Sequence, residues 1–215
     1  MIIIALTDIH GALSHLEQIE RELRAADWVF LGGDITHFGG ASAAADVINY
    51  IRKMNSAVFA VAGNCDEPEV DAYLGAENLG GHGRISQNCG LTVLGVGGSL
   101  PVPVFTPNTF SEDEYKVFFS RMEGAMDSPP DILVSHQPPW RTNLDKVWGM
   151  KHVGSRSLRN YIERAAPRLV FCGHIHESSG CDTIGDTRLV NPGPFRHGKY
   201  ARICFDEDTL EIELF

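Results

Sequence analysis

Long apolar runs are absent from this sequence, and none approaches the ~20 residues that a membrane-spanning helix needs. The first residues, Met1-Ile-Ile-Ile-Ala-Leu-Thr-Asp8, contain no basic segment, and their apolar stretch ends at Asp8. Such a segment is typical of a buried strand and not of a signal peptide. We therefore expect a cytoplasmic protein with no membrane partner.

Cysteine is sparse and unclustered. The five cysteines form no C-x-x-C pair and are odd in number; they are Cys65, Cys89, Cys172, Cys181 and Cys204. This pattern predicts reduced thiols, and it argues against both a disulfide framework and a structural zinc–thiolate site.

Basic residues are outnumbered by acidic ones. The 215-residue chain has 18 Lys and Arg against 28 Asp and Glu, which gives a formal net charge of −10. An acidic surface repels phosphate backbones, so a nucleic-acid partner is not expected. The sequence does not specify an oligomeric state, and a homo-oligomer stays open.

The order of expected elements predicts an α/β fold. The length suits a single domain, residues 1–215, and no linker or repeat divides it. Strands and helices alternate through the first half, which implies parallel strands with right-handed crossovers. Short strands alone follow residue 180. The sequence therefore predicts two packed mixed β-sheets with helices outside.

Individual elements follow from apolar periodicity. Strands are expected at 2–7, 28–31, 57–62, 91–96, 132–134, 169–172, 187–190, 201–205 and 210–214. Helices are expected at 11–26, 42–54, 67–74, 111–126 and 157–166. Ser111 and Glu114 suit a capping box at the start of the fourth helix. His82 and His197 are expected at the surface.

Five short motifs place Asp, His or Asn directly after a predicted strand. They are Asp8-Ile-His10, Gly33-Asp34, Gly63-Asn64, Ser135-His136 and Gly173-His174-Ile-His176. Because the carboxyl ends of parallel strands converge on the ligand site of such sheets, these residues can meet in one crevice.

The residue types in these motifs suit metal binding. Aspartate oxygens and neutral imidazoles are ligands for Mn, Fe, Zn or Ni. In Asp8-x-His10 and His174-x-His176 the two side chains would point the same way if the segments are extended. The glycines before Asp34, Asn64 and His174 fit turns where the backbone passes close to a site.

The pattern D-x-H, G-D, G-N, a lone H and G-H-x-H resembles the calcineurin-like metallophosphoesterases, and it extends from Asp8 to His176. The later Asn191-Pro192-Gly193 is also common in small bacterial and archaeal members. The resemblance implies a four-layer α/β/β/α sandwich and two divalent cations, Mn first and Fe, Zn, Ni or Mg as alternatives. It implies that Asp8, His10 and His176 hold one metal, that Asn64, His136 and His174 hold the other, and that Asp34 bridges them.

The implied reaction is attack of a metal-bridging hydroxide on the phosphorus of a small phosphate ester, with the metals about 3.5–4 Å apart. We expect Asp34, Asn64, Cys65 and Asp66 to be the catalytic residues. The family usually has histidine where this chain has Cys65, and that histidine contacts the phosphate and assists the leaving group. A cysteine cannot do so as a cation, although nearby metals could lower its pKa. Asp66 would then orient a site histidine or a water molecule.

Candidate substrate contacts lie outside the ligand motifs. The segment from Gln137 to Trp140 and the segment around His152 are similar to parts of class III cyclic-nucleotide phosphodiesterases, and they are expected at the rim of the pocket. Cys65, His152, Asn191 and Arg196 are the candidate substrate-binding residues.

Three main functions stay open on these residues, and a nuclease is a fourth, against which the acidic balance of the chain argues. A phosphodiesterase is the leading hypothesis, and a phosphomonoesterase of the same family is the second. The third is a catalytically inactive interaction module with this fold. Ordinary structural roles compete at single positions: Asp34 and Asn64 also suit turns, and Cys65 also suits a packing thiol.

Overall fold

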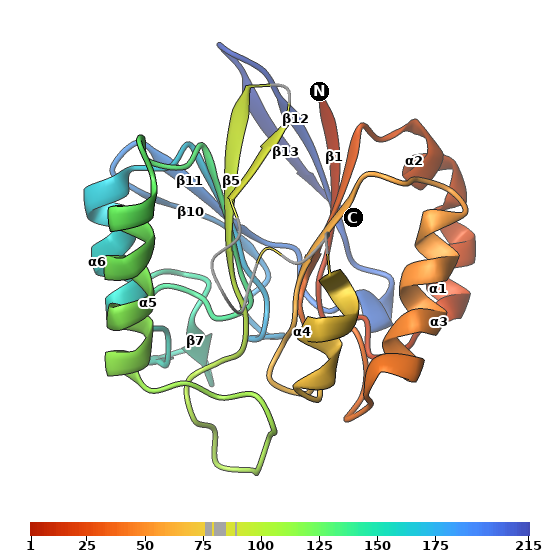
Figure 1. Ribbon diagram of the computed structural model, residues 1–215, viewed down its shortest axis with the longest axis horizontal. Helices are drawn as coiled ribbons and strands as arrows, with labels where there is room; N and C mark the ends of the chain where they lie inside the picture. The colour runs from red at the N-terminus through yellow and green to blue at the C-terminus, as the bar shows by residue number, and fades with distance from the viewer. Residues whose placement is uncertain (76–78, 80–84, 89) are drawn as a thin grey trace.

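The first of two sheets is built around three parallel strands. In the computed structural model, which describes residues 1–75, 79, 85–88 and 90–215, β1 (Ile2–Leu6), β2 (Trp28–Gly32) and β3 (Val58–Val61) pair in parallel (Figure 1). β12 (Ala201–Phe205) and β13 (Leu210–Leu214) extend this sheet in antiparallel fashion beyond β1. The order is β13-β12-β1-β2-β3.

The second sheet has six strands, of which the inner four are parallel and the outer two antiparallel. In spatial order they are β10 (Gly180–Ile184), β11 (Thr187–Asn191), β9 (Leu169–Phe171), β6 (Ile132–Ser135), β5 (Leu91–Val96) and β4 (Ile85–Asn88). Both sheets are therefore mixed, as the sequence predicts. Two short elements lie apart from them: the hairpin of β7 (Lys146–Val147) and β8 (Lys151–His152), and the 3-10 turn η2 (Phe195–His197).

Helices cover the outer face of each sheet, so the two sheets lie between two helical layers (Figure 1). Beside the first sheet lie α1 (Leu13–Gln18), α2 (Glu20–Ala25), α3 (Ala41–Arg52) and α4 (Glu69–Leu74). Beside the second lie α5 (Glu112–Ala125) and α6 (Arg156–Ala165). This is the predicted four-layer α/β/β/α sandwich.

One predicted helix is wrong. Residues 11–26 do not form a single helix, because α1 and α2 are separated at Ile19, whose φ of −114° and ψ of 19° leave the helical region. Apolar spacing continued across this break, since Leu16, Ile19 and Leu23 are all buried in the same core. Periodicity alone therefore could not reveal the change of direction.

Strand β1 shows how the layers are held together. Ile3 and Ala5 face the core between the two sheets, whereas Ile4 and Leu6 face the core under the first helical layer. Successive side chains of a strand point to opposite faces, so an unbroken apolar run is what a strand buried on both sides needs.

The second helical layer is fixed by specific contacts at the helix ends. Ser111 and Glu114 form the predicted capping box at the start of α5. Glu112 accepts hydrogen bonds from the backbone N–H groups of Arg156 and Ser157, which joins α5 to the first turn of α6. Further along, the stacked rings of Phe119 and Tyr161 lie 4.4 Å apart.

Four cysteines, Cys65, Cys172, Cys181 and Cys204, are free thiols. Cys89 and His82 lie outside the described residues. Within the described part of the chain, no helix combines the length and apolar character needed to cross a membrane.

Candidate metal centre

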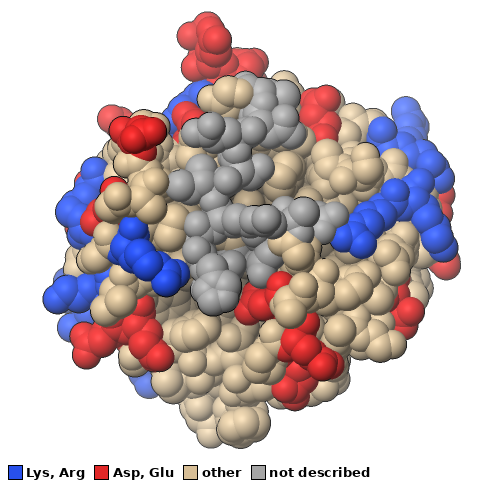
Figure 2. Space-filling model, in the orientation of Figure 1, with Lys and Arg blue, Asp and Glu red and all other residues tan. Residues whose placement is uncertain are grey.

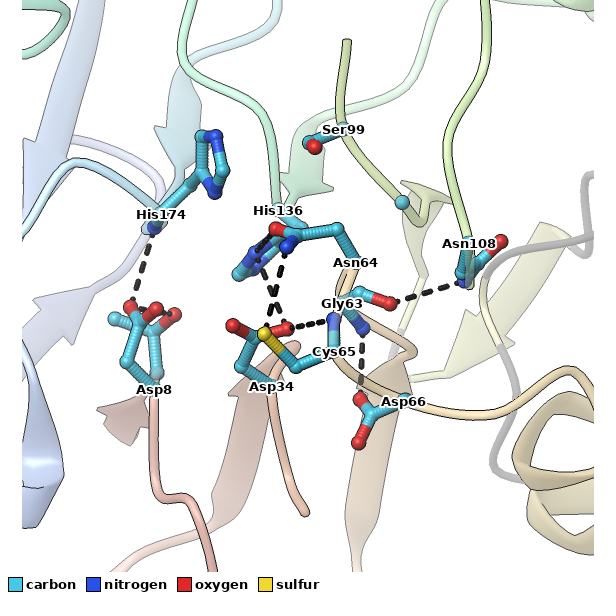
Figure 3. Close-up of polar contacts among 12 residues, drawn as sticks. Asp8, Asp34, Gly63, Asn64, Cys65, Asp66, Ser99, Asn108, His136 and His174 are labelled. Carbon is cyan, nitrogen blue, oxygen red and sulfur yellow. Dashed lines mark hydrogen bonds and ion pairs between the residues drawn. The ribbon is translucent and has the colours of Figure 1, made fainter. Parts of the chain in front are cut away.

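The strand ends of both sheets meet at one edge of the sandwich. Asp8 follows β1, Asp34 follows β2, Asn64 follows β3, His136 follows β6 and His174 follows β9. Figure 3 shows these five side chains together, with Cys65 beside Asp34. The structure therefore brings together residues that are up to 166 positions apart in the chain.

Close backbone packing at this edge requires glycine. A Cβ on Gly33 would lie 2.6 Å from His136 Nδ1, and one on Gly63 would overlap the Asp34 carboxylate. A Cβ on Gly173 would overlap the Thr7 hydroxyl and lie 2.8 Å from Asp8 Oδ2. The expected close approach at these glycines is confirmed, and it explains how loops from both sheets reach the same point.

The ligand segments are not extended, so that part of the sequence argument is wrong. Asp8, His10, Asp34 and His174 all have left-handed backbone, with φ of 54°, 47°, 49° and 68°. Residues other than glycine rarely adopt this backbone region, and such backbone strain concentrates at functional sites. Tight turns and not strand alternation therefore aim these side chains into the site.

A first cluster consists of the three residues expected to hold one metal. One ligand atom each from Asp8, His10 and His176 lie within 4.8 Å of one another. Asp8 Oδ1 is 2.9 Å from His176 Nε2, and the other Asp8 oxygen accepts a hydrogen bond from the Thr7 hydroxyl at 2.8 Å. This geometry suits three ligands on one side of a cation.

A second cluster joins Asp34 and His136 to Asp8, again within 4.8 Å. Asp34 lies between the clusters: Oδ1 is 3.5 Å from His136 Nε2, and Oδ2 is 3.7 Å from His10 Nε2. Asn64 Oδ1 adds a neutral oxygen 3.0 Å from His136 Nε2. One carboxylate thus faces histidines of both sets, as a bridging ligand must.

His174 lies at the outer side of this arrangement. Its ring centroid is 5.1 Å from that of His136, while its backbone N–H donates to Asp8 Oδ2 at 3.2 Å (Figure 3). It belongs to none of the three groups of close ligand atoms among the described residues. Its predicted ligand role stays a prediction.

Hydrogen bonds to the backbone fix which histidine nitrogen faces the site. His10 Nδ1 lies 3.2 Å from the Thr36 carbonyl, and His136 Nδ1 lies 2.8 Å from the Gly32 carbonyl. A carbonyl only accepts, so each Nδ1 carries a proton, and each Nε2 presents a lone pair to the site when its ring is neutral. These contacts orient the rings as metal-binding histidines require.

The donors that remain fit divalent cations. His10 Nε2 is buried and has no hydrogen-bond partner. His136 Nε2 faces the Asn64 and Asp34 oxygens. Burial tends to lower the pKa of His136, but the negative charges of Asp34 and Asp8 outweigh it and raise this pKa, so a proton on Nε2 or a metal ion in its place satisfies these oxygens. Buried acceptors in such an arrangement need a proton or a metal ion. The set of oxygen and imidazole donors suits Mn, Fe, Zn or Ni.

The pKa shifts of Asp8 and His174 also favour metal binding. Burial tends to raise the pKa of Asp8, but the His176 hydrogen bond and the positive charge of His136 outweigh it and hold this pKa far below its ordinary value. Burial lowers the pKa of His174 to about 4. An ionised carboxylate and an unprotonated imidazole are the forms that bind metal.

Cys65 lies inside the site, with a ligand atom within 4.8 Å of those of His10 and Asp34. Burial, followed by the charge of Asp34, raises the pKa of the Cys65 thiol far above its ordinary range. The thiol is therefore neutral when only protein groups surround it. Its backbone N–H donates to Asp34 Oδ1 at 2.8 Å, which fixes the orientation of that carboxylate.

Among the described residues, Asp66 forms no hydrogen bond with a histidine. Its carboxylate accepts hydrogen bonds from the backbone N–H groups of Ile35, Thr36 and Gly63, and the Thr36 hydroxyl lies 2.8 Å from Oδ1. Burial and the charge of Asp34 raise the pKa of Asp66 to about 6. Asp66 ties the turn after β2 to the turn after β3, and so positions Asp34 and Asn64.

The other candidate substrate residues differ in their surroundings. His152 Nδ1 lies 2.6 Å from buried Asp145. The buried Asn191 amide donates to the Ile175 carbonyl and accepts from the Gly193 N–H. Arg196 Nη2 lies 3.3 Å from His176 Nδ1, and its buried Nε has no hydrogen-bond partner. Arg196 is thus the one of these three with a free donor at the cluster.

Sequence reasoning missed the groups that hold the ligands in place. The Gly32 and Thr36 carbonyls orient histidines, and the Asn108 side chain donates to the Gly63 carbonyl at 3.0 Å (Figure 3). Every residue has a carbonyl, so no sequence signal distinguishes the two that matter. Asn108 lies 45 residues from its partner, in a segment without a motif.

Comparison with known proteins supports the same interpretation of the site. The family model of the calcineurin-like phosphoesterases matches residues 1–178. An uncharacterized protein of Methanocaldococcus jannaschii is 36% identical over 201 residues, which cover 90% of this chain and 88% of the relative.

Two solved structures share the fold. The crystal structure of TT1561 from Thermus thermophilus superposes with a TM-score of 0.76 and 20% identity, over 99% of this chain and 97% of the other. A structure described as a novel archaeal phosphodiesterase gives a TM-score of 0.59 and 13% identity over the whole of both chains. These structures show the shared fold, and the family match over residues 1–178 shows that the chain belongs to the calcineurin-like phosphoesterases.

Proposed function

We propose that this protein is a phosphodiesterase that hydrolyses small phosphate esters with two divalent cations as cofactors. One observation carries the proposal: buried Asp34 has one carboxylate oxygen toward His10 and the other toward His136. The chain thus offers two sets of ligands that share one carboxylate. Two cations bound in this way supply a water molecule of lowered pKa and neutralise the phosphoryl oxygens.

The protein groups have distinct tasks in this proposal. Asp8, His10 and His176 would hold one cation, and Asn64, His136 and His174 the other. The Thr36 and Gly32 carbonyls keep the Nε2 atoms of His10 and His136 directed at the site. Arg196, at the edge of the first cluster, is placed to donate to a phosphoryl oxygen.

Position 65 supports a diester substrate. A cationic acid here would help a poor leaving group depart and would favour a dianionic monoester. A cysteine carries no positive charge in either protonation state, so Cys65 cannot supply such a cationic acid. We therefore propose that diesters with good leaving groups are the better substrates.

The test is hydrolysis of bis(p-nitrophenyl) phosphate and of p-nitrophenyl phosphate by the purified protein supplied with Mn. We expect the higher kcat/KM with the diester. A higher value with the monoester would instead support a phosphomonoesterase, and no hydrolysis of either compound would contradict both enzymatic functions.

An inactive interaction module is the remaining alternative. Elemental analysis separates it from the enzyme, because a scaffold should contain no stoichiometric metal, whereas the proposed enzyme binds two ions per chain. Competition among Mn, Fe, Zn, Ni and Mg in the same assay would identify the preferred ion. We propose Mn, since the mixed oxygen and imidazole donors suit it.

We also propose that the partners are small molecules and not nucleic acids or membranes. On the face shown in Figure 2, basic side chains lie in separate groups with acidic ones among them, and the described residues form no continuous basic band there. The net charge of −10 acts against polyanions in the same way. Salt-dependent DNA binding by the purified protein would contradict this proposal about partners.

The free thiols suit a reducing compartment. We therefore propose that the protein is located in the cytoplasm, and cell fractionation would test this location.

A further inference from the structure

A cavity of about 560 Å³ opens beside the metal centre, and His174 and Ile175 form part of its wall. Its other walls come from residues 100–103 and from the segment that contains the hairpin of β7 and β8. A volume of this size suits a small organic ligand. Since His174 also adjoins His136 and Asp8, a molecule in the cavity would lie next to the metal centre.

The walls of this cavity are apolar and carry balanced charge. Pro101, Pro103, Val147 and Ile175 supply apolar surface, and the charged residues that line it are one lysine, Lys151, and one glutamate, Glu177. Opposite charges at one cavity favour neither a second phosphate nor a cation. The cavity therefore suits an uncharged organic group.

Trp148 is the unusual residue of the cavity wall. Its side chain is 83% exposed, although large aromatic groups normally gain from burial. Its backbone is left-handed, with φ of 50°, and its N–H donates to Glu177 Oε1 at 2.6 Å. Glu177 directly follows the ligand His176. A strained and exposed tryptophan is thus tied to the metal-binding segment.

We infer that Trp148 is a specificity-determining residue, against which a planar aromatic group of the phosphate ester packs. This inference rests on the proposed function, because the phosphate of the same molecule would lie at the metal centre. An indole face and a flat ring stack favourably, and Pro101 and Pro103 of the same cavity add apolar surface. The substrate class is then an aromatic phosphate ester and not an alkyl or polyphosphorylated one.

The test compares phenyl phosphate with methyl phosphate, which carry the same phosphate on an aromatic or an aliphatic group. Their dissociation constants are measured by calorimetry on the Mn-loaded protein. We expect phenyl phosphate to bind about tenfold more tightly, as one aromatic contact allows. Trp148→Ala should reduce this preference to about twofold or less, and Trp148→Phe should keep most of it.

Two further variants serve as controls for the phenyl preference. Trp140→Phe is a matched control in the same region, because the Trp140 ring lies between the guanidinium groups of Arg141 and Arg156 and does not line the cavity. Its phenyl preference should equal that of the wild type. Trp148→Gly suits the left-handed backbone, so it should fold at least as stably as Trp148→Ala and still lose the preference.

The outcomes separate this inference from the proposed function. Retained phenyl preference in both Trp148→Ala and Trp148→Gly would overturn the inference, as would failure of phenyl phosphate to bind the wild type. A change from dimer to monomer in Trp148→Ala, with the preference unchanged, would assign Trp148 to a subunit interface and overturn it too. A Trp148-dependent preference in a protein that hydrolyses no ester would support the inference while the proposed function fails.

Discussion

Two buried carboxylates, Asp34 and Asp145, show how similar groups serve different ends. Asp145 accepts backbone hydrogen bonds from Arg141, Thr142 and Gly154 at 3.0–3.1 Å, and His152 Nδ1 lies 2.6 Å away. Asp34 accepts a backbone hydrogen bond from Cys65, and its side-chain neighbours include the Cys65 thiol and the imidazoles of His10 and His136. Both carboxylates are buried, so their hydrogen-bond partners and not their burial distinguish structural Asp145 from Asp34, the bridging ligand of the proposed function.

The difference between Asp34 and Asp145 follows from the groups that surround each carboxylate. Three backbone N–H groups and His152 satisfy the Asp145 carboxylate, and these bonds hold the loop of residues 139–155 in place. The imidazoles beside Asp34 donate their Nδ1 protons to carbonyls, so only their Nε2 atoms face the carboxylate, where a proton or a metal ion can lie. Such a site gains from a cation, whereas the environment of Asp145 does not.

The largest effect is expected from Asp34→Asn. The amide keeps an oxygen for the Cys65 N–H but removes the charge shared between the two clusters. Hydrolysis of bis(p-nitrophenyl) phosphate should fall by about 1,000-fold in kcat/KM, since charge stabilisation by the metals is worth several kcal/mol. Residual activity above a tenth of wild type would remove Asp34 from its bridging role.

Asp145→Asn should have the opposite profile. The new NH₂ group faces backbone N–H donors, and leaving them unsatisfied should lower the free energy of unfolding by about 3 kcal/mol. Urea denaturation measures this loss. Activity per folded molecule on bis(p-nitrophenyl) phosphate, the substrate used for Asp34→Asn, should stay within about threefold of wild type. A stable but inactive Asp145→Asn variant would show that Asp145 is needed for catalysis and not for stability.

The gain in stability on metal binding should also distinguish the Asp34 and Asp145 variants. Mn at 100 times its dissociation constant should raise the free energy of unfolding by about 2.7 kcal/mol, and EDTA should reverse the gain. The increase should persist in Asp145→Asn and largely vanish in Asp34→Asn. An equal increase in both variants would place the stabilising ion elsewhere.

The smallest of these effects concerns Cys65→His. An imidazole at this position adds a cationic donor beside Asp34, so the ratio of monoester to diester kcat/KM should rise by about tenfold. Cys65→Ser is the matched control, because a neutral hydroxyl should leave the ratio near that of wild type. An unchanged ratio with histidine would end the argument that position 65 selects the leaving group.

The sequence predicted the fold and the gathering of the ligands from local rules. Strands 91–96, 201–205 and 210–214 have the observed bounds, and five polar motifs after strands indicated one edge of the sheets. Such features depend on neighbouring residues only, so periodicity reveals them.

What the sequence could not predict depends on distant partners. The left-handed turns at Asp8 and His10 follow from contacts with the next loop, such as the bond from the Asp8 N–H to the Gly33 carbonyl. The exposed tryptophan at position 148 depends on Glu177, which lies 29 residues away. Backbone strain and hydrogen bonds of this kind leave no residue pattern.

The contact between Asp8 and His174, which spans 166 residues, bears on how the protein matures. During synthesis, the first ligand must wait for the last ones to leave the ribosome, and β1 must also wait for its antiparallel neighbour β12. Contacts of such long range form late and slowly. In the proposed enzyme, binding of the metal pair would therefore require completed folding, and the rate of metal uptake would measure the rate of its final step.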